Sequence, residues 1–197
     1  MLERRILWGV RTTLVAALAF GVAFPDLPQF DGKGMAFRAP FFLLPMAAVP
    51  VGWRLRGRRD RYPYLADALI VAPFLVDTLG NVLDFYESFG STDDVLHLLN
   101  WVLLVAGITL LLLRTPMPRL AAWALGYGIG ALTIIWWEAA EWLVQELGTA
   151  GLQLTYDDTI GDLVVSSTGG ALGAWLAVRF GPGPDASASR RPSPSTS

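Results

Sequence analysis

The sequence predicts an all-α fold: a polytopic transmembrane bundle of about six spans, with the N and C termini in the cytosol. Three observations predict it. Hydrophobic residues make up 53% of the chain and charged residues only 16%, whereas soluble proteins carry about 25% charged residues. Six segments are long and apolar enough to cross a bilayer, which takes about 20 residues. The basic residues also segregate to one side of a six-span topology, as the positive-inside rule requires.

The first two spans are expected near residues 6–24 and 35–53. Met1–Arg5 resembles the charged start of a signal peptide, but Arg11 interrupts the apolar run that follows. Because that run is as long as a full span, we expect a retained helix. The second segment contains three prolines, at positions 40, 45 and 50. Prolines are tolerated in membrane helices, so a kinked span is expected there, with a re-entrant hairpin as the alternative.

The remaining spans are expected near residues 64–84, 95–113, 120–143 and 159–178. Turn-forming or charged segments separate them. All six spans form a single transmembrane bundle over residues 1–180. Arg11 and Asp67 lie near the cytosolic edges of their spans and are interpreted as a structural ion pair. Residues 181–197 are rich in Pro and Ser and lack apolar periodicity, which predicts a disordered cytosolic tail.

The positions of the basic residues indicate the orientation. Of the 15 Lys and Arg residues, twelve precede span one, follow span six or lie in the loops after spans two and four. Only Lys33 and Arg38 fall on the opposite side, and Arg11 lies within a span. Cytosolic loops carry an excess of Lys and Arg. The chain is therefore predicted to be a multi-pass protein of the cytoplasmic (inner) membrane.

The acidic residues have the opposite distribution. Of the 17 Asp and Glu residues, thirteen lie in extracytoplasmic loops or at the outer ends of spans. Most belong to short motifs whose spacing of three or four places them on one helix face. These motifs are Asp77, Asn81 and Asp84; Asp93, Asp94 and His97; Glu138, Glu141 and Gln145; and Asp158 and Asp162.

A carboxylate inside the bilayer costs about 2.5–3.5 kcal/mol on insertion scales. Asp77, Glu138 and Asp162 are therefore expected to face the bundle interior or a wet cavity. Converging carboxylates repel, so protons, a bound cation or a cationic substrate must offset their charge. The alternative is that some are solvated loop acids or helix N-caps. That alternative applies most directly to Glu87, Asp94 and Asp157, and Asp157 or Asp158 is a candidate cap for span six.

Small residues predict close helix packing at two places. Gly126 and Gly130 in span five, and Gly169 and Gly173 in span six, have the spacing that allows helices to approach closely. We expect these two pairs to face each other. Such packing would bring Glu138 and Glu141 towards Asp158 and Asp162.

The second half of the chain resembles the YjdF-like family of uncharacterised bacterial inner-membrane proteins, and more distantly the VanZ-like family linked to teicoplanin resistance. The matching motifs are Asp93-x-x-x-His97, Glu138-Ala-Ala-Glu141-Trp142 and Asp158-Thr-Ile-Gly-Asp162. They lie within residues 77 to 178. The chain departs from the family pattern at Asp94, where a basic residue is usual. The resemblance implies a shared helical fold and no defined biochemical activity.

These residues predict an acidic site with one His at the extracytoplasmic end of the bundle, which binds or processes a lipid or envelope precursor. The expected partners are membrane lipids and not nucleic acid, and the substrate stays undefined. Carboxylates with one imidazole suit a divalent metal such as Zn, Mn or Fe. Cys is absent, so thiolate ligands are excluded. The alternatives are a non-catalytic module that protects the envelope, and a cation transporter.

The candidate residues fall into three groups. The candidate catalytic residues of a metal-dependent hydrolase or transferase are Glu138, Glu141 and Asp162. The candidate metal ligands are Asp93, His97, Glu141, Asp158 and Asp162. A further polar site is expected at Asp77, Asn81 and Asp84.

Overall fold

The computed structural model describes residues 1–31, 33–57, 61–88, 90–147 and 155–182. The tail predicted to be disordered lies almost wholly outside the described residues. The elements are α1 (Leu2–Ala23), the short 3-10 helix η1 (Pro28–Phe30), α2 (Met35–Leu43), α3 (Pro45–Leu55), α4 (Tyr64–Val82), α5 (Phe85–Ser88), α6 (Thr92–Leu112), α7 (Arg119–Glu146) and α8 (Tyr156–Phe180). Within these ranges the chain is helical and contains six apolar segments long enough to span a membrane. The predicted fold class is confirmed.

The second span is kinked, as its prolines predict. It runs from Met35 to Leu55 as α2 followed by α3, and the two helices meet at Leu44, whose backbone stays helical with φ −56° and ψ −43°. Pro45 begins α3 and lacks the N–H that would continue the α2 hydrogen-bond ladder. The chain therefore bends without reversing direction, and the re-entrant alternative is wrong.

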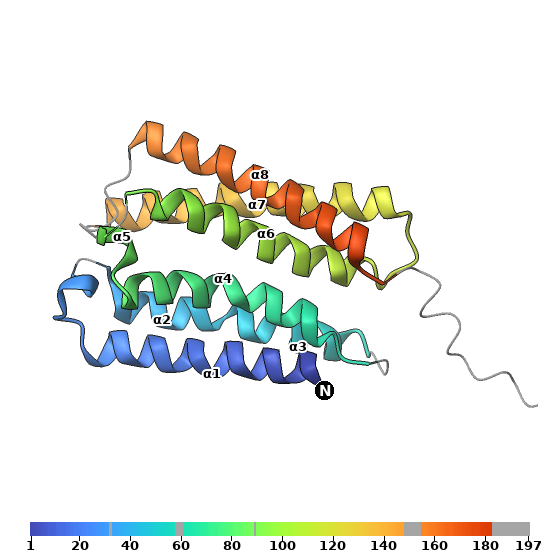
Figure 1. Cartoon of the computed structure of the whole chain (residues 1–197), viewed down its shortest axis with the longest axis horizontal. Helices are drawn as coiled ribbons and strands as arrows, with labels where there is room; N and C mark the ends of the chain where they lie inside the picture. The colour runs from blue at the N-terminus through green and yellow to red at the C-terminus, as the bar shows by residue number, and fades with distance from the viewer. Residues whose placement is uncertain (32, 58–60, 89, 148–154, 183–197) are drawn as a thin grey trace, which may run out of the picture.

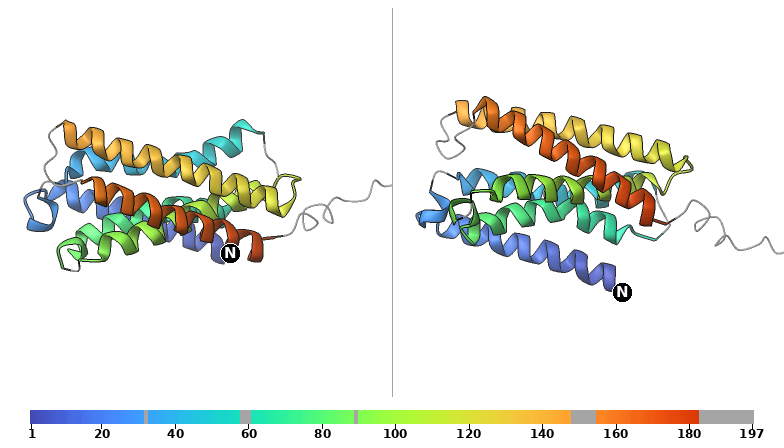
Figure 2. Two further views of the ribbon diagram at one scale, coloured as in Figure 1. Left: turned by 90° about the horizontal axis from the view of Figure 1, so that it is seen from above. Right: turned by 45° about the horizontal axis from the view of Figure 1, so that its top comes forward.

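The helices form two layers (Figure 1). In one layer α1, α4, α6 and α8 lie side by side, each packed on the next. In the second layer the α2–α3 span packs on α1 and α4, while α7 packs on α6 and α8. Viewed from above, α7 and the α2–α3 span lie on the same side of the first layer (Figure 2). The second layer therefore has one span over each half of the first.

The N-terminus and the C-terminal end of α8 lie at the same end of the bundle (Figure 1). The C-terminal end of α3 and the start of α4, which border the basic loop, lie at that end as well. The predicted ion pair is confirmed there, because Arg11 Nη2 lies 2.7 Å from Asp67 Oδ2 and the Asp67 side chain is fully buried. Charge segregation thus matches the geometry of the bundle, and the cytosolic placement of this end stays a prediction.

The prediction that the two glycine pairs face each other is wrong, because both pairs pack against α6. A Cβ on Gly169 would lie 2.5 Å from the Leu98 carbonyl oxygen of α6, and one on Gly173 would meet Val102 of the same helix. On α7, Gly126 and Gly130 meet side chains of α6. The central helix is therefore the one that α7 and α8 both approach closely.

Two helix ends also differ from expectation. The side chain of Thr155 caps α8 by accepting a hydrogen bond from the Asp158 backbone N–H at 3.2 Å, so neither Asp157 nor Asp158 is the cap. Helix α4 ends at Val82, before Asp84, which is exposed and has a positive φ of 58°. Asp84 therefore does not continue the helix face of Asp77 and Asn81.

Candidate functional site

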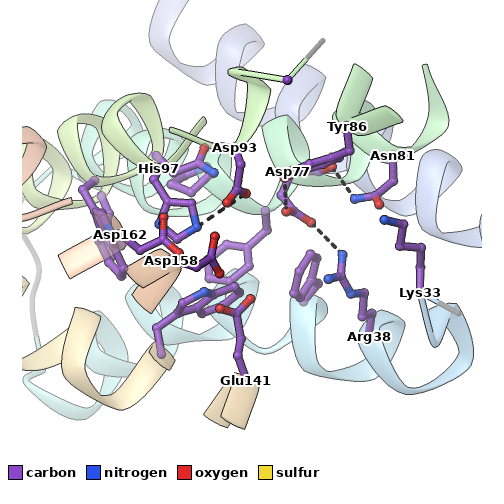
Figure 3. Close-up of a pocket in the computed structure, with 18 residues that line it drawn as sticks. Lys33, Arg38, Asp77, Asn81, Tyr86, Asp93, His97, Glu141, Asp158 and Asp162 are labelled. Atoms are coloured by element: carbon purple, nitrogen blue, oxygen red, sulfur yellow. Dashed lines mark hydrogen bonds and ion pairs between the residues drawn. The ribbon is translucent and has the colours of Figure 1, made fainter. Parts of the chain in front are cut away.

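A polar pocket of about 470 Å³ opens at the end of the bundle opposite the N-terminus and the C-terminal end of α8. It is bounded by α2, the C-terminal half of α4, α5, the first half of α6, the second half of α7 and the start of α8 (Figure 3). Its lining residues are Lys33, Arg38, Phe42, Pro73, Phe74, Asp77, Asn81, Tyr86, Gly90, Asp93, His97, Asn100, Trp101, Leu104, Trp137, Glu141, Asp158 and Asp162. The sequence motifs on four separate spans therefore converge on one cavity.

One side of the pocket is built around His97. Its Nε2 lies 3.8 Å from Asp93 Oδ1, one turn earlier on α6, and its Nδ1 lies 3.6 Å from Asp162 Oδ1 of α8. Nδ1 is also 3.1 Å from the hydroxyl of Ser166, one turn after Asp162. One ligand atom from each of Asp93, His97 and Asp162 lies within 4.8 Å of the others. The close packing of α6 on α8 at Gly169 and Gly173 is what brings these side chains together.

The other side of the pocket is built around Asp77. Its Oδ2 accepts a hydrogen bond of 3.2 Å from Arg38 Nη1, and its Oδ1 accepts one of 2.7 Å from the Tyr86 hydroxyl. The Lys33 ammonium lies 5.7 Å from the centre of the Tyr86 ring. Burial, together with the neighbouring Asp77 carboxylate, raises the pKa of Tyr86 well above its ordinary value. Tyr86 is therefore a neutral hydrogen-bond donor to Asp77.

Glu138 and Glu141 lie one helical turn apart on α7 but in different surroundings. Glu141 lines the polar pocket. Glu138 does not; it is 7% exposed, and neither carboxylate oxygen has a hydrogen-bond partner among the described residues. An unpaired buried carboxylate is costly, so Glu138 is a buried acidic group that the hydrogen bonds of the described residues leave unsatisfied.

The structure thus brings together most of the predicted site residues. Asp93, His97 and Asp162 form one group, whereas Glu141 and Asp158 line the same pocket outside that group. Asp77 and Asn81 line the opposite side, and Asp84 lies outside the pocket.

Arg38 and Lys33 are the functional candidates that sequence reasoning missed. They are the two basic residues that fell on the acidic side of the predicted topology. Their position on the acidic side of the topology is the signal that identifies them. A basic residue surrounded by many acidic residues is expected to pair with one of them. For Arg38 this partner is Asp77.

Comparison with protein families gives one match. A family model described as predicted membrane protein (DUF2238) matches residues 6–182. The chain belongs to this family. It is the YjdF-like group that the sequence motifs resemble, and the more distant likeness to the VanZ-like family stays a prediction. No curated protein and no solved structure matches the chain. The family description agrees with the six apolar helices of the structure.

Proposed function

We propose that this is a multi-pass inner-membrane protein whose polar pocket binds a divalent metal ion and, with it, the polar part of a lipid or envelope precursor at the extracytoplasmic face. The observation that carries the proposal is the convergence of Asp93, His97 and Asp162 from two helices. One imidazole with two carboxylates is a ligand set that Zn, Mn and Fe accept.

The charge balance supports a metal rather than a proton alone. A protonated His97 would offset a single negative charge, whereas the carboxylates of Asp93 and Asp162 both lie within 4 Å of its ring nitrogens. Arg38 is already engaged by Asp77. A divalent ion would offset two charges at once and would occupy the space between carboxylates that otherwise repel.

Glu141 is the residue that we propose for chemistry beyond binding. It lines the pocket and is not in the group of three ligands. A metal ion held by those ligands lowers the pKa of bound water. A carboxylate at the position of Glu141 would then serve as general base or acid towards that water or the substrate.

The test is metal content. The protein is purified in detergent without a histidine tag, dialysed against Zn²⁺ or Mn²⁺, and analysed for bound metal. We expect one ion per chain, lost in Asp162→Asn and retained in the matched control Asp157→Asn. Asp157 lies on the same helix but is exposed and does not line the pocket. A folded wild type that holds no metal, or equal metal in both variants, would overturn the proposal.

A further inference from the structure

An apolar groove of about 460 Å³ lies beside the polar pocket, between α2 and α7. Phe37 and Phe41 of α2 line one wall, and Ala140, Leu143 and Val144 of α7 line the other. Phe37 is 85% exposed and Phe41 is 56% exposed. Both walls belong to apolar spans of the second layer, so a bilayer crossed by these spans would place lipid beside the groove. Lipid chains are the apolar material available at that position.

The groove and the polar pocket have a common wall. Lys33, Arg38, Phe42, Trp137 and Glu141 line both cavities. In Figure 3, Lys33 and Arg38 lie together, to the right of Glu141. Asp77, Asp93, Asp158 and Asp162 line the polar pocket only. A molecule that extends from the groove into the pocket therefore meets apolar side chains, then two basic residues with Glu141, and then further carboxylates.

This order matches the chemistry of one class of lipid. We infer that the occupant is a zwitterionic phospholipid with an ethanolamine headgroup, with an acyl chain in the groove between α2 and α7 and its headgroup in the polar pocket. The inference rests on the proposed function and names its substrate class. Along such a lipid, an apolar chain is followed by an anionic phosphate and then by a cationic ammonium group.

Each part of the headgroup has a matching side chain. Arg and Lys bind phosphate oxygens through charge-assisted hydrogen bonds, and Arg38 and Lys33 lie where the groove meets the pocket. Arg38 has donors beyond the one that binds Asp77. The primary ammonium has three N–H donors for carboxylates, and Glu141 and Asp158 line the pocket outside the proposed metal ligands. A trimethylammonium group lacks these donors, and a glycerol headgroup lacks the positive charge.

The experiment measures lipid retention by native mass spectrometry. The purified protein is offered phosphatidylethanolamine, phosphatidylcholine and phosphatidylglycerol with identical acyl chains. We expect at least a tenfold preference for phosphatidylethanolamine over each of the others. Equal retention of the three lipids, or a preference for either of the other two, would overturn the inference. This comparison uses the wild type and needs no variant.

A matched pair of substitutions tests the groove. Ala140→Trp fills the groove and is expected to reduce retention at least tenfold. Ala139→Trp adds the same side chain to an exposed neighbouring position that does not line the groove, and should leave retention unchanged. Equal retention in the two variants would contradict the placement of the acyl chain. Metal content should be unchanged in Ala140→Trp, so failure of the lipid inference is distinguishable from failure of the metal site.

Discussion

Replacing Arg11 with Met is predicted to destabilise the bundle through Asp67. The Arg11 guanidinium joins three spans, because Nη2 lies 2.7 Å from Asp67 Oδ2 of α4 and donates to the Met46 carbonyl of α3 at 2.8 Å. The Tyr62 hydroxyl donates a second hydrogen bond of 2.5 Å to the same Asp67 oxygen. Among the described residues, the substitution leaves the fully buried carboxylate with this tyrosine as its hydrogen-bond donor.

The expected loss is about 3 kcal/mol of unfolding free energy. Removing one partner of a buried ion pair costs about 3–5 kcal/mol, and a charged side chain within the bilayer costs about 2.5–3.5 kcal/mol. The double variant Arg11→Met with Asp67→Asn removes both charges and should recover at least half of this loss. The matched control is Arg61→Gln, because the pair of Arg61 with Glu3 is exposed, at 64% and 43%, and exposed pairs contribute about 1 kcal/mol or less.

The assay is reversible unfolding in mixed micelles of increasing dodecyl sulfate content, followed by circular dichroism. The reasoning is refuted if Arg11→Met costs no more than Arg61→Gln. A double variant that is no more stable than Arg11→Met would also refute it, because the unpaired carboxylate would then not be the source of the loss.

Three further predictions concern packing, ionisation and orientation. Gly169→Ala should cost about 1–3 kcal/mol in the same unfolding assay because its Cβ meets the backbone of α6, whereas Gly161→Ala, with nothing within 4 Å on the same helix, should be neutral or stabilising. Burial raises the pKa of both Tyr62 and Tyr86 above 10.0. The test is a variant that carries both Tyr62→Phe and Tyr86→Phe. At about pH 11, one unit above the ordinary tyrosine pKa, the folded variant should have the same phenolate absorbance as the folded wild type. A lower absorbance in the variant would show that these two tyrosines ionise in the folded wild type. Since the unfolded chain ionises both, stability should fall as the pH rises above 10. A reporter fused after Trp53 should be cytosolic, and an extracytoplasmic result would reverse the orientation of the pocket.

The spans and the location of the acidic residues could be predicted from the sequence because both depend on local properties. Apolar run length determines which segments cross a bilayer, and the placement of Asp77, Glu138 and Asp162 within apolar runs requires them to face the protein. The kink of the second span follows from its prolines in the same way.

Helix pairing and the exact membership of the site could not be predicted, because they depend on how each helix is rotated against its neighbours. The glycines of α7 and α8 indicate close approach but not the partner, and that partner is α6. Asp84 has the right spacing for the site, yet α4 ends two residues earlier. Glu138 and Glu141 share a motif, yet only Glu141 lines the pocket.

Zinc X-ray absorption spectroscopy on the loaded protein tests the metal site most directly. His97 is the chain's single His and Cys is absent, so an imidazole signal from protein without a histidine tag has one source. We predict one imidazole nitrogen at about 2.0–2.1 Å and carboxylate oxygens at about 2.0–2.2 Å from the metal, with the imidazole signal lost in His97→Gln. A coordination shell of oxygen alone in the wild type, or an unchanged spectrum in His97→Gln, would contradict the account.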